Sequence, residues 1–246
     1  MERPNRFIAR IMLDGEEKIC HVKNTGRCKE LLIPGSEIYV QEFPEALTGS
    51  PGDLPNTAQN GQKKSYRSTA YDLIAVRKGT RLINMDSLAP NKAAAELLPA
   101  LFPGLISYSA EQRYGDSRFD LAGEYAQNGK VKKFFLEVKG VTLEQDGVVL
   151  FPDAPTERGR KHLEELAKAV SEGYDACILF LIQMENVKYF SPNAATDPAF
   201  ALALRNANAA GVRLFAYDCF VTPDSISTKE RVPIRLADDR SDDICV

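Results

Sequence analysis

One dipeptide constrains the fold of this chain more than any other feature. Asn128-Gly129 lies between two stretches of strand-forming residues. An Asn-Gly pair is the strongest short signal for a two-residue hairpin turn, because both central residues of that turn require a positive φ. Such a turn sets the register of the two strands, since a shift by one residue moves every side chain to the other face. In this register Asp120 faces Glu137, with the two Cβ atoms expected about 4.5–5.5 Å apart.

A second turn, at Gly115-Asp116, adds a third strand and places Glu111 opposite Asp120. The sequence therefore predicts a row of three carboxylates across one sheet face: Glu111, Asp120 and Glu137. Carboxylates that face one another repel, and a protein tolerates them when a cation neutralises them or a proton is held between them. Because clustered oxygen ligands suit Mg²⁺ or Mn²⁺, the row predicts a divalent-metal site.

Lys139 lies two residues after Glu137, so a strand directs both side chains to the same face. An ammonium there would orient a water or stabilise charge that develops on a phosphoryl group. We therefore expect Asp120, Glu137 and Lys139 as the catalytic set. The expected metal ligands are Asp120, Glu137, Glu111 and, from the preceding helix, Glu96. An ordinary solvated strand face, with Arg118 and Lys139 as counter-charges, is the alternative that the pattern leaves open.

The chain from about residue 90 alternates between helical and strand-like segments. Helices are expected at 91–102, with Asn91 as the cap, and at 197–211. A further helix is expected to begin near Asp153 and Thr156 and to end at Gly173. Strands are expected at 105–113, 117–125, 131–139, 175–183 and 212–221. The run 175–183 is almost continuously apolar, which is typical of a strand buried on both faces. This order predicts a three-layer α/β/α domain with a mixed sheet at residues 86–222.

The first 85 residues show a different pattern. Five short strand-like segments, with an Asp14-Gly15 hairpin turn between the first two, predict a small OB-like β-barrel at residues 1–85. Residues 44–66 are rich in Pro, Gly, Asn and Ser, which predicts a long mobile loop. Residues 223–246 are polar and charged, and we expect a loosely held tail there.

Basic residues gather in two places that suit a phosphate chain. The net charge of the chain is −3, but residues 1–85 carry 13 Lys and Arg against 10 Asp and Glu. Within them, Asn24-Thr25-Gly26 predicts a capped short helix whose N-terminus lies near Arg27, a suitable seat for phosphate. Arg158, Lys161 and His162 share one face of a later helix, unless they pair with the neighbouring glutamates. The expected nucleic-acid contacts are Lys23, Arg27, Lys29, Arg158, Lys161 and His162.

Cysteines and hydropathy indicate the compartment. The five cysteines are an odd number without a Cys-x-x-Cys pair, which favours free thiols. A zinc site from Cys20, His21 and Cys28 is the alternative, but it lacks a clear fourth ligand. No apolar run approaches the length of a membrane span, and the N-terminus has no signal-peptide core. We expect a cytoplasmic protein that does not enter a membrane, and the oligomeric state stays open.

Asp120 followed by Glu137-Val138-Lys139 on the next strand, in αβββαβ order, resembles the PD-(D/E)xK nuclease fold, with Phe119 in place of the motif's Pro. The chain up to about residue 222 also resembles the sugar fermentation stimulation protein A family. The segments that carry this resemblance are "HVKNTGRCKELLIPG", "YDLIAV", "APNK", "YGDSRFD", "FLEVKGVTL", "FPDAPTERGRKHLEEL", "VKYFSPN" and "AYDC". It implies an OB-like domain, a nuclease-like domain and nonspecific DNA binding linked to regulation of sugar utilisation.

Three functions follow from these observations. The first is a DNA-binding protein with a nuclease-like Mg²⁺ or Mn²⁺ site and a regulatory effect. The second is an active metal-dependent nuclease or phosphodiesterase, and the third is a catalytically silent scaffold. The intact Asp120, Glu137 and Lys139 set disfavours the third, but a fold does not fix a function, so the first two stay open. We expect binding dominated by phosphate contacts, sensitive to salt and without strong sequence preference.

Overall fold

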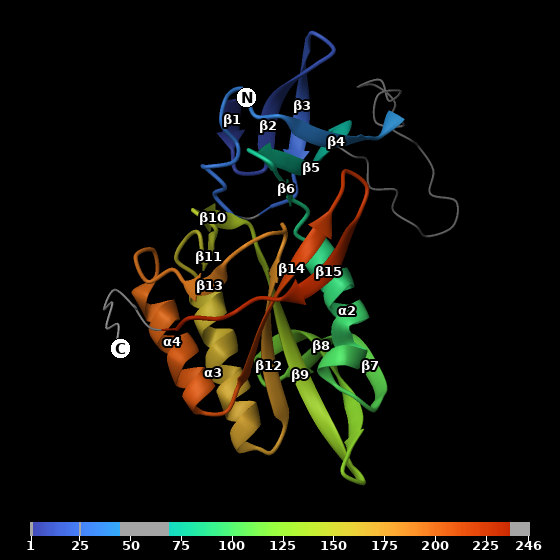
Figure 1. Ribbon diagram of the computed structural model, residues 1–246, viewed down its shortest axis with the longest axis vertical. Helices are drawn as coiled ribbons and strands as arrows, with labels where there is room; N and C mark the ends of the chain where they lie inside the picture. Colours follow the sequence, from blue (N-terminus) through green and yellow to red (C-terminus); the bar gives the residue numbers. More distant parts are fainter. Residues whose placement is uncertain (1, 25, 45–68, 237–246) are drawn as a thin grey trace, which may run out of the picture.

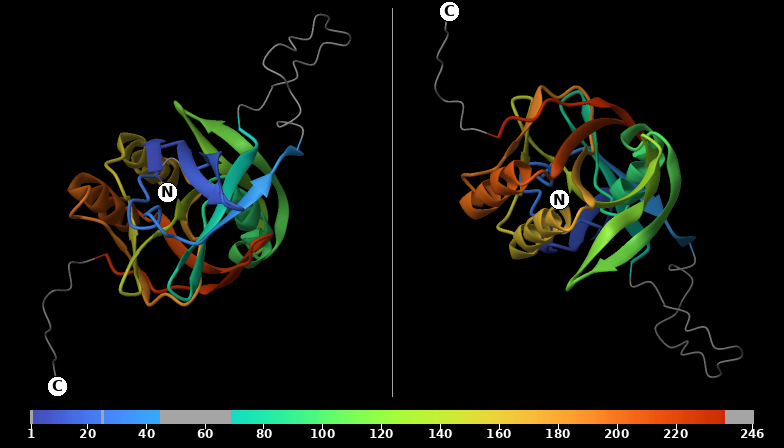
Figure 2. Two further views of the ribbon diagram at one scale, coloured as in Figure 1. Left: turned by 90° about the horizontal axis from the view of Figure 1, so that it is seen from above. Right: turned by 90° about the horizontal axis from the view of Figure 1, so that it is seen from below.

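The computed structural model describes residues 2–24, 26–44 and 69–236 (Figure 1). The predicted loop at 44–66 lies outside the described residues except for residue 44, and so does the end of the predicted tail, 237–246. The described chain forms two sheets of six strands and one of three strands. The first sheet lies above the second in Figure 1, and it lies in front of the second in the view from above (Figure 2, left).

The first sheet is the predicted barrel. Its strands are β1 (Glu2–Asn5), β2 (Ile8–Leu13), β3 (Glu16–Val22), β4 (Ile38–Glu42), β5 (Tyr71–Lys78) and β6 (Arg81–Asn84). They run in the order β1-β2-β3-β5-β4, with β6 beside β5 and with β3 and β5 parallel. Asp14 and Gly15 both have positive φ, as the predicted hairpin turn requires. The sequence missed the short β1. The predicted helix after Gly26 is absent, because only turn bonds to the Cys28 carbonyl form there.

The second large sheet is mixed and runs β15-β14-β12-β9-β8-β7. Its strands are β7 (Leu105–Tyr114), β8 (Ser117–Gln127), β9 (Lys130–Val141), β12 (Asp175–Ile182), β14 (Arg213–Val221) and β15 (Ile226–Arg231). Strands β9, β12 and β14 are parallel to one another, and the outer pairs are antiparallel. The prediction that residues 223–246 form a loose tail is wrong for β15, because its backbone pairs with β14.

Helices cover both faces of this sheet. They are α2 (Ala89–Leu101), α3 (Glu157–Ser171) and α4 (Pro198–Ala209). α3 and α4 lie on one side of the sheet and α2 on the other, which gives the three layers (Figure 2). Strand β12 is buried on both faces, so its apolar residues serve both clusters, with Phe180 on the α3 side and Leu179 on the α2 side. No helix in the described part of the chain is long and apolar enough to cross a membrane.

The two domains are joined by polar contacts at the top of the second sheet. A small third sheet contributes there: β10 (Leu143–Gln145), β11 (Val148–Phe151) and β13 (Tyr189–Pro192). Glu144 is 2% exposed and accepts hydrogen bonds from Lys78 at 2.8 Å and Arg81 at 3.1 Å. The Gln183 amide donates to the Asn84 side chain at 3.0 Å. These contacts hold the barrel against the upper end of the second sheet (Figure 1).

Candidate metal centre

The β8–β9 hairpin has the predicted register, but only up to one residue before the site. Residues pair from Gln127 with Lys130 to Leu121 with Leu136, and the ladder ends there. Continued past this point, the predicted register would pair Phe119 with Val138, but Phe119 packs on the α3 side of the sheet and Val138 on the α2 side. The alternation of β8 is therefore broken at Asp120, and the two strands separate where the site begins.

Asp120 spans the gap between the separating strands. Its Oδ2 atom accepts a hydrogen bond from the Val138 backbone N–H at 2.8 Å, and its Oδ1 atom accepts one from the Asn91 amide at 2.9 Å. Asn91 lies inside the first turn of α2 and is not the cap that the sequence predicted, since the helix begins at Ala89. Burial, and then the nearby charge of Glu137, raise the pKa of the Asp120 carboxyl above its ordinary value.

Glu137 is the most buried acid of the site, at 3% exposure. Its Oε1 atom accepts from Lys139 Nζ at 2.5 Å and lies in hydrogen-bond contact with His162 Nδ1. Its Oε2 atom is buried and has no hydrogen-bond partner among the described residues. Burial alone would raise the pKa of this carboxyl, but the His162 hydrogen bond and the Lys139 charge outweigh it, and the pKa lies below its ordinary value.

His162 belongs to this centre and not to an exposed nucleic-acid surface. The residue is 3% exposed, and its ring packs edge-on with the Phe119 ring, with 6.1 Å between the two ring centroids. The sequence carried a signal for this position, because His162, Leu166 and Ala169 follow the i, i+4, i+7 spacing of one buried helix face. α3 itself begins where predicted, with the Thr156 side chain accepting from the backbone N–H of Gly159.

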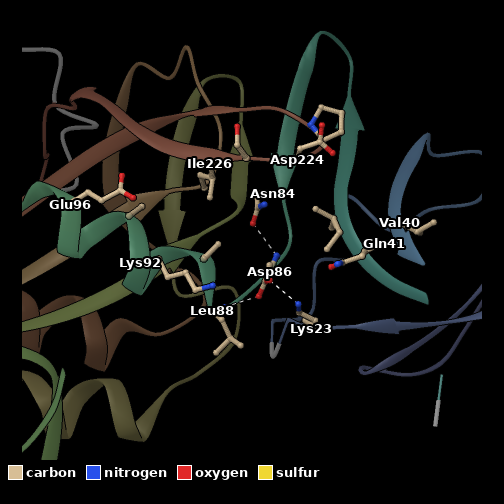
Figure 3. Close-up of a pocket in the computed structure, with 15 residues that line it drawn as sticks. Lys23, Val40, Gln41, Asn84, Asp86, Leu88, Lys92, Glu96, Asp224 and Ile226 are labelled. Atoms are coloured by element: carbon tan, nitrogen blue, oxygen red, sulfur yellow. Dashed lines mark hydrogen bonds and ion pairs between the residues drawn. The ribbon is translucent and has the colours of Figure 1, made fainter. Parts of the chain in front are cut away.

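The predicted row of three carboxylates does not form. Glu111 has a positive φ of 56°, is exposed and pairs with Arg118 at 3.3 Å. Glu96 is exposed on α2 and lines a separate cleft of about 750 Å³ beside Lys92 (Figure 3). In the described ranges, no three His, Cys, Asp or Glu side chains group closely enough to hold a metal ion, which also argues against the zinc alternative. The centre therefore offers two carboxylates whose charges interact, those of Asp120 and Glu137.

This pair fits a hard divalent cation that keeps part of its water shell. Mg²⁺ is typically held by one or two carboxylates together with several waters. The unpartnered Oε2 atom of Glu137 supplies a free ligand oxygen, and the oxygens of Asp120 each retain a lone pair beyond the one hydrogen bond they accept. Without a cation the buried Oε2 atom carries an uncompensated desolvation cost.

The expected nucleic-acid contacts differ in their surroundings. Lys23 is held within the cleft of Figure 3, where its Nζ atom lies 2.8 Å from Asp86. Arg27 and Lys29 are exposed on the barrel loop that faces the second domain, and Asp153 accepts from the Arg27 backbone N–H at 2.6 Å. Arg158 is exposed in the first turn of α3. Lys161 is also exposed and lies 4.0 Å from Glu165.

Comparison with known proteins agrees with this two-part organisation. A family model described as "SfsA N-terminal OB domain" matches residues 1–85, and one described as "Sugar fermentation stimulation protein RE domain" matches residues 88–225. The chain belongs to the sugar fermentation stimulation protein family. It is 50% identical over 239 residues to a sugar fermentation stimulation protein homolog of Desulfitobacterium hafniense, covering 97% of this chain and 95% of that protein.

Another homolog of the sugar fermentation stimulation protein family, from Clostridium beijerinckii, is 46% identical over 236 residues, covering 95% of this chain and 94% of that protein. Among solved structures, the chain is similar to Pyrococcus furiosus SfsA in complex with Ca²⁺. The TM-score is 0.72 at 26% identity, over 96% of this chain and 93% of that one. The fold expected from the sequence, an OB domain followed by an α/β domain with a mixed sheet, is thereby confirmed.

Proposed function

We propose that this protein binds DNA, without strong sequence preference, at a divalent-cation site of the nuclease type. The observation that carries the proposal is the Glu137 carboxylate, whose Oε1 atom is hydrogen-bonded while its buried Oε2 atom has no partner in the part of the chain that the structure describes. A cation shared with Asp120 would satisfy that oxygen and offset the repulsion between the two acids. Mg²⁺ or Mn²⁺ is the expected ion, because both prefer oxygen ligands.

The solved relative supports this choice of ligand. The Pyrococcus furiosus protein is described as a complex with Ca²⁺, a hard cation that takes oxygen ligands. For the present chain, we infer a hard cation on Asp120 and Glu137. The relatives' names connect them with stimulation of sugar fermentation, and we propose that DNA binding by this chain serves regulation of sugar utilisation.

The surroundings of the site suit a phosphate backbone. Two helices begin beside it, α2 next to Asn91 and α3 at Thr156, and helix N-termini favour anions. The exposed side chains that would contact phosphates are Arg27, Lys29, Arg158 and Lys161. Lys23 is already paired with Asp86, so we expect it to contribute less. A bound cation would add positive charge that the formal net charge of −3 does not include.

Hydrolysis of a phosphodiester is the second candidate function, and Lys139 is the observation that favours it. Its Nζ atom lies 2.5 Å from Glu137, and its side chain is 14% exposed. When bound, a divalent cation supplies polarisation of the phosphoryl oxygen and a more acidic water. Asp120 and Glu137 would orient the scissile phosphate, and Lys139 would stabilise the negative charge that develops on it.

One experiment tests both candidates. Purified protein is incubated with labelled single- and double-stranded DNA and RNA, in EDTA and in Mg²⁺ or Mn²⁺, and binding and cleavage are measured on the same samples. Binding to DNA that strengthens with the cation supports the first function, and cleavage lost in Asp120→Asn and Lys139→Met supports the second. Glu124→Gln, which alters only an exposed pair with Lys133, is the matched control. Absence of DNA binding at low salt would contradict the proposal.

A further inference from the structure

His162 joins an exposed arginine to the buried carboxylate of the site. Its Nδ1 atom contacts Glu137 Oε1, and its Nε2 atom lies 3.4 Å from Arg158 Nε on the preceding turn of α3. The Nζ atom of Lys139 lies 3.5 Å from the same Nδ1 atom, so both nitrogen groups converge on one oxygen of Glu137. The other oxygen, Oε2, is buried and accepts no hydrogen bond from residues 2–24, 26–44 or 69–236.

The partners of the ring assign its tautomer. A guanidinium only donates hydrogen bonds, so His162 Nε2 must be the acceptor of the Arg158 bond. The ring proton is then on Nδ1, where it is donated to Glu137 Oε1. Arg158 thus determines which ring nitrogen donates, and His162 determines which carboxylate oxygen is saturated.

The geometry points to His162 as the residue that positions Glu137 for the cation. This inference rests on the cation site proposed above and deepens it. With Oε1 held by two donors, the carboxylate cannot rotate without losing both bonds, and Oε2 stays directed at the place a cation would take. Partners that orient a metal ligand in this way raise affinity, and their removal typically lowers metal affinity by about 10–100-fold. Arg158 acts indirectly: its hydrogen bond to Nε2 keeps the proton of the His162 ring on Nδ1.

If His162 had a purely structural role, its replacement would change the stability of the protein but not its affinity for the cation. The ring also fills space against Phe119, so its removal could lower stability without touching the cation. Two amide variants separate these roles. In Asn, the side-chain nitrogen lies near the position of histidine Nδ1 and can still donate to Glu137, whereas in Gln it lies near the position of Nε2. His162→Asn and His162→Gln both lose the ring, but only the first keeps the donor.

The experiment is Mn²⁺ titration by calorimetry on the full chain, with the wild type, His162→Asn, His162→Gln and His162→Leu, together with thermal unfolding in EDTA. We expect His162→Asn to stay within about threefold of the wild-type Mn²⁺ affinity, and the Gln and Leu variants to lose about 10–100-fold. The melting temperatures in EDTA report the packing effect separately. We expect those of His162→Asn and His162→Gln to fall by similar amounts, because both variants lose the ring.

Equal Mn²⁺ affinity in the wild type and His162→Leu would overturn the inference while leaving the cation site intact. Equal losses in His162→Asn and His162→Gln would also overturn it, because the donor would then be irrelevant. If the wild type binds no Mn²⁺, the cation site itself is wrong, and the inference falls with it.

Discussion

Replacing each carboxylate of the site by its amide should change the stability of the cation-free protein in opposite directions. Glu137→Gln removes the negative charge beside Lys139, whose side chain is only 14% exposed. Loss of one partner of a buried ion pair costs about 3–5 kcal/mol, and the retained His162 contact favours the low end, about 3 kcal/mol. For a chain of this size, that is a fall in melting temperature of roughly 6–12 °C.

Asp120→Asn should leave the cation-free protein as stable as the wild type or more stable. The substitution removes a charge that burial and Glu137 disfavour. An asparagine oxygen can still accept from the Val138 N–H, and the Asn91 amide can turn to present its oxygen to the new side-chain nitrogen. The hydrogen bonds are therefore kept while the repulsion is lost.

The pH dependence follows from the directions of the two pKa shifts. The pKa of Glu137 is lowered, so its stabilising contribution is present above the ordinary value of 4.5 and is lost as pH falls. The deficit of Glu137→Gln should therefore shrink in acid. The pKa of Asp120 is raised, so the wild type loses stability as pH rises from the ordinary value of 3.8 through the raised value. The advantage of Asp120→Asn should be absent below 3.8 and complete above the raised pKa.

Thermal unfolding in EDTA and in Mn²⁺ measures these effects, and circular dichroism is the suitable signal because the chain has no tryptophan. At a Mn²⁺ concentration 100 times Kd, the free energy of unfolding of the wild type should rise by about 2.7 kcal/mol, and that of both amide variants should rise little or not at all.

The control is Glu124→Gln, which changes an exposed ion pair and should behave as the wild type. If Asp120→Asn loses as much stability in EDTA as Glu137→Gln, the surroundings do not disfavour the charge of Asp120 while favouring that of Glu137, and the prediction is wrong. An equal response of all proteins to Mn²⁺ would show that these carboxylates do not bind it.

Three further predictions concern the rest of the molecule. Glu144→Gln, which removes the carboxylate between Lys78 and Arg81, should lower the melting temperature at pH 7, because the two cations lower the pKa of Glu144. The deficit should be complete above the ordinary pKa of 4.5 and should vanish as the pH falls through the lowered value; a melting temperature unchanged at pH 7 would contradict this prediction. Gly140→Ala should cost about 1–3 kcal/mol in urea unfolding, because its Cβ would lie 2.5 Å from Gln183 Oε1; a midpoint equal to the wild type would show that Gln183 moves aside. The affinity for DNA should fall by about 10³-fold or more between 50 and 200 mM salt if the protein contacts six or more phosphates. An affinity that does not change with salt in a binding titration would exclude binding dominated by phosphate contacts.

Local signals in the sequence were reliable because they act over a few residues. The Asn128-Gly129 turn set the pairing of β8 with β9, since a two-residue turn permits one register. The unbroken apolar run of β12 showed a strand buried on both faces. The Thr156 cap and the stop at Gly173 bounded α3 closely, because capping depends on the residues next to the helix ends.

The same local register was misleading at the site itself. Extending it by one residue predicted that Asp120 would face Glu137 in the ladder, but the strands separate there. Where the strands separate, Asp120 instead accepts a hydrogen bond from the Asn91 amide of α2, a residue 29 positions away in the sequence. The register of the β7–β8 hairpin also predicted Glu111 in the site. In the structure Glu111 has a positive φ and pairs with Arg118, so its carboxylate does not join Asp120 and Glu137. No pattern within one hairpin contains that information.

The sequence by itself determined the two kinds of domain and most elements of the second one. It also identified Asp120, Glu137 and Lys139 as candidate site residues. Periodicity, turns and caps depend only on residues close together in the sequence, so they can be read without the tertiary structure. Only the tertiary structure decided that β15 joins the sheet and that His162 turns inward to Glu137. It also decided that one oxygen of that carboxylate has no partner within the described segments. These features depend on how α3 packs against β9, and packing brings together residues 25 positions apart through the burial of apolar surface that no local pattern specifies.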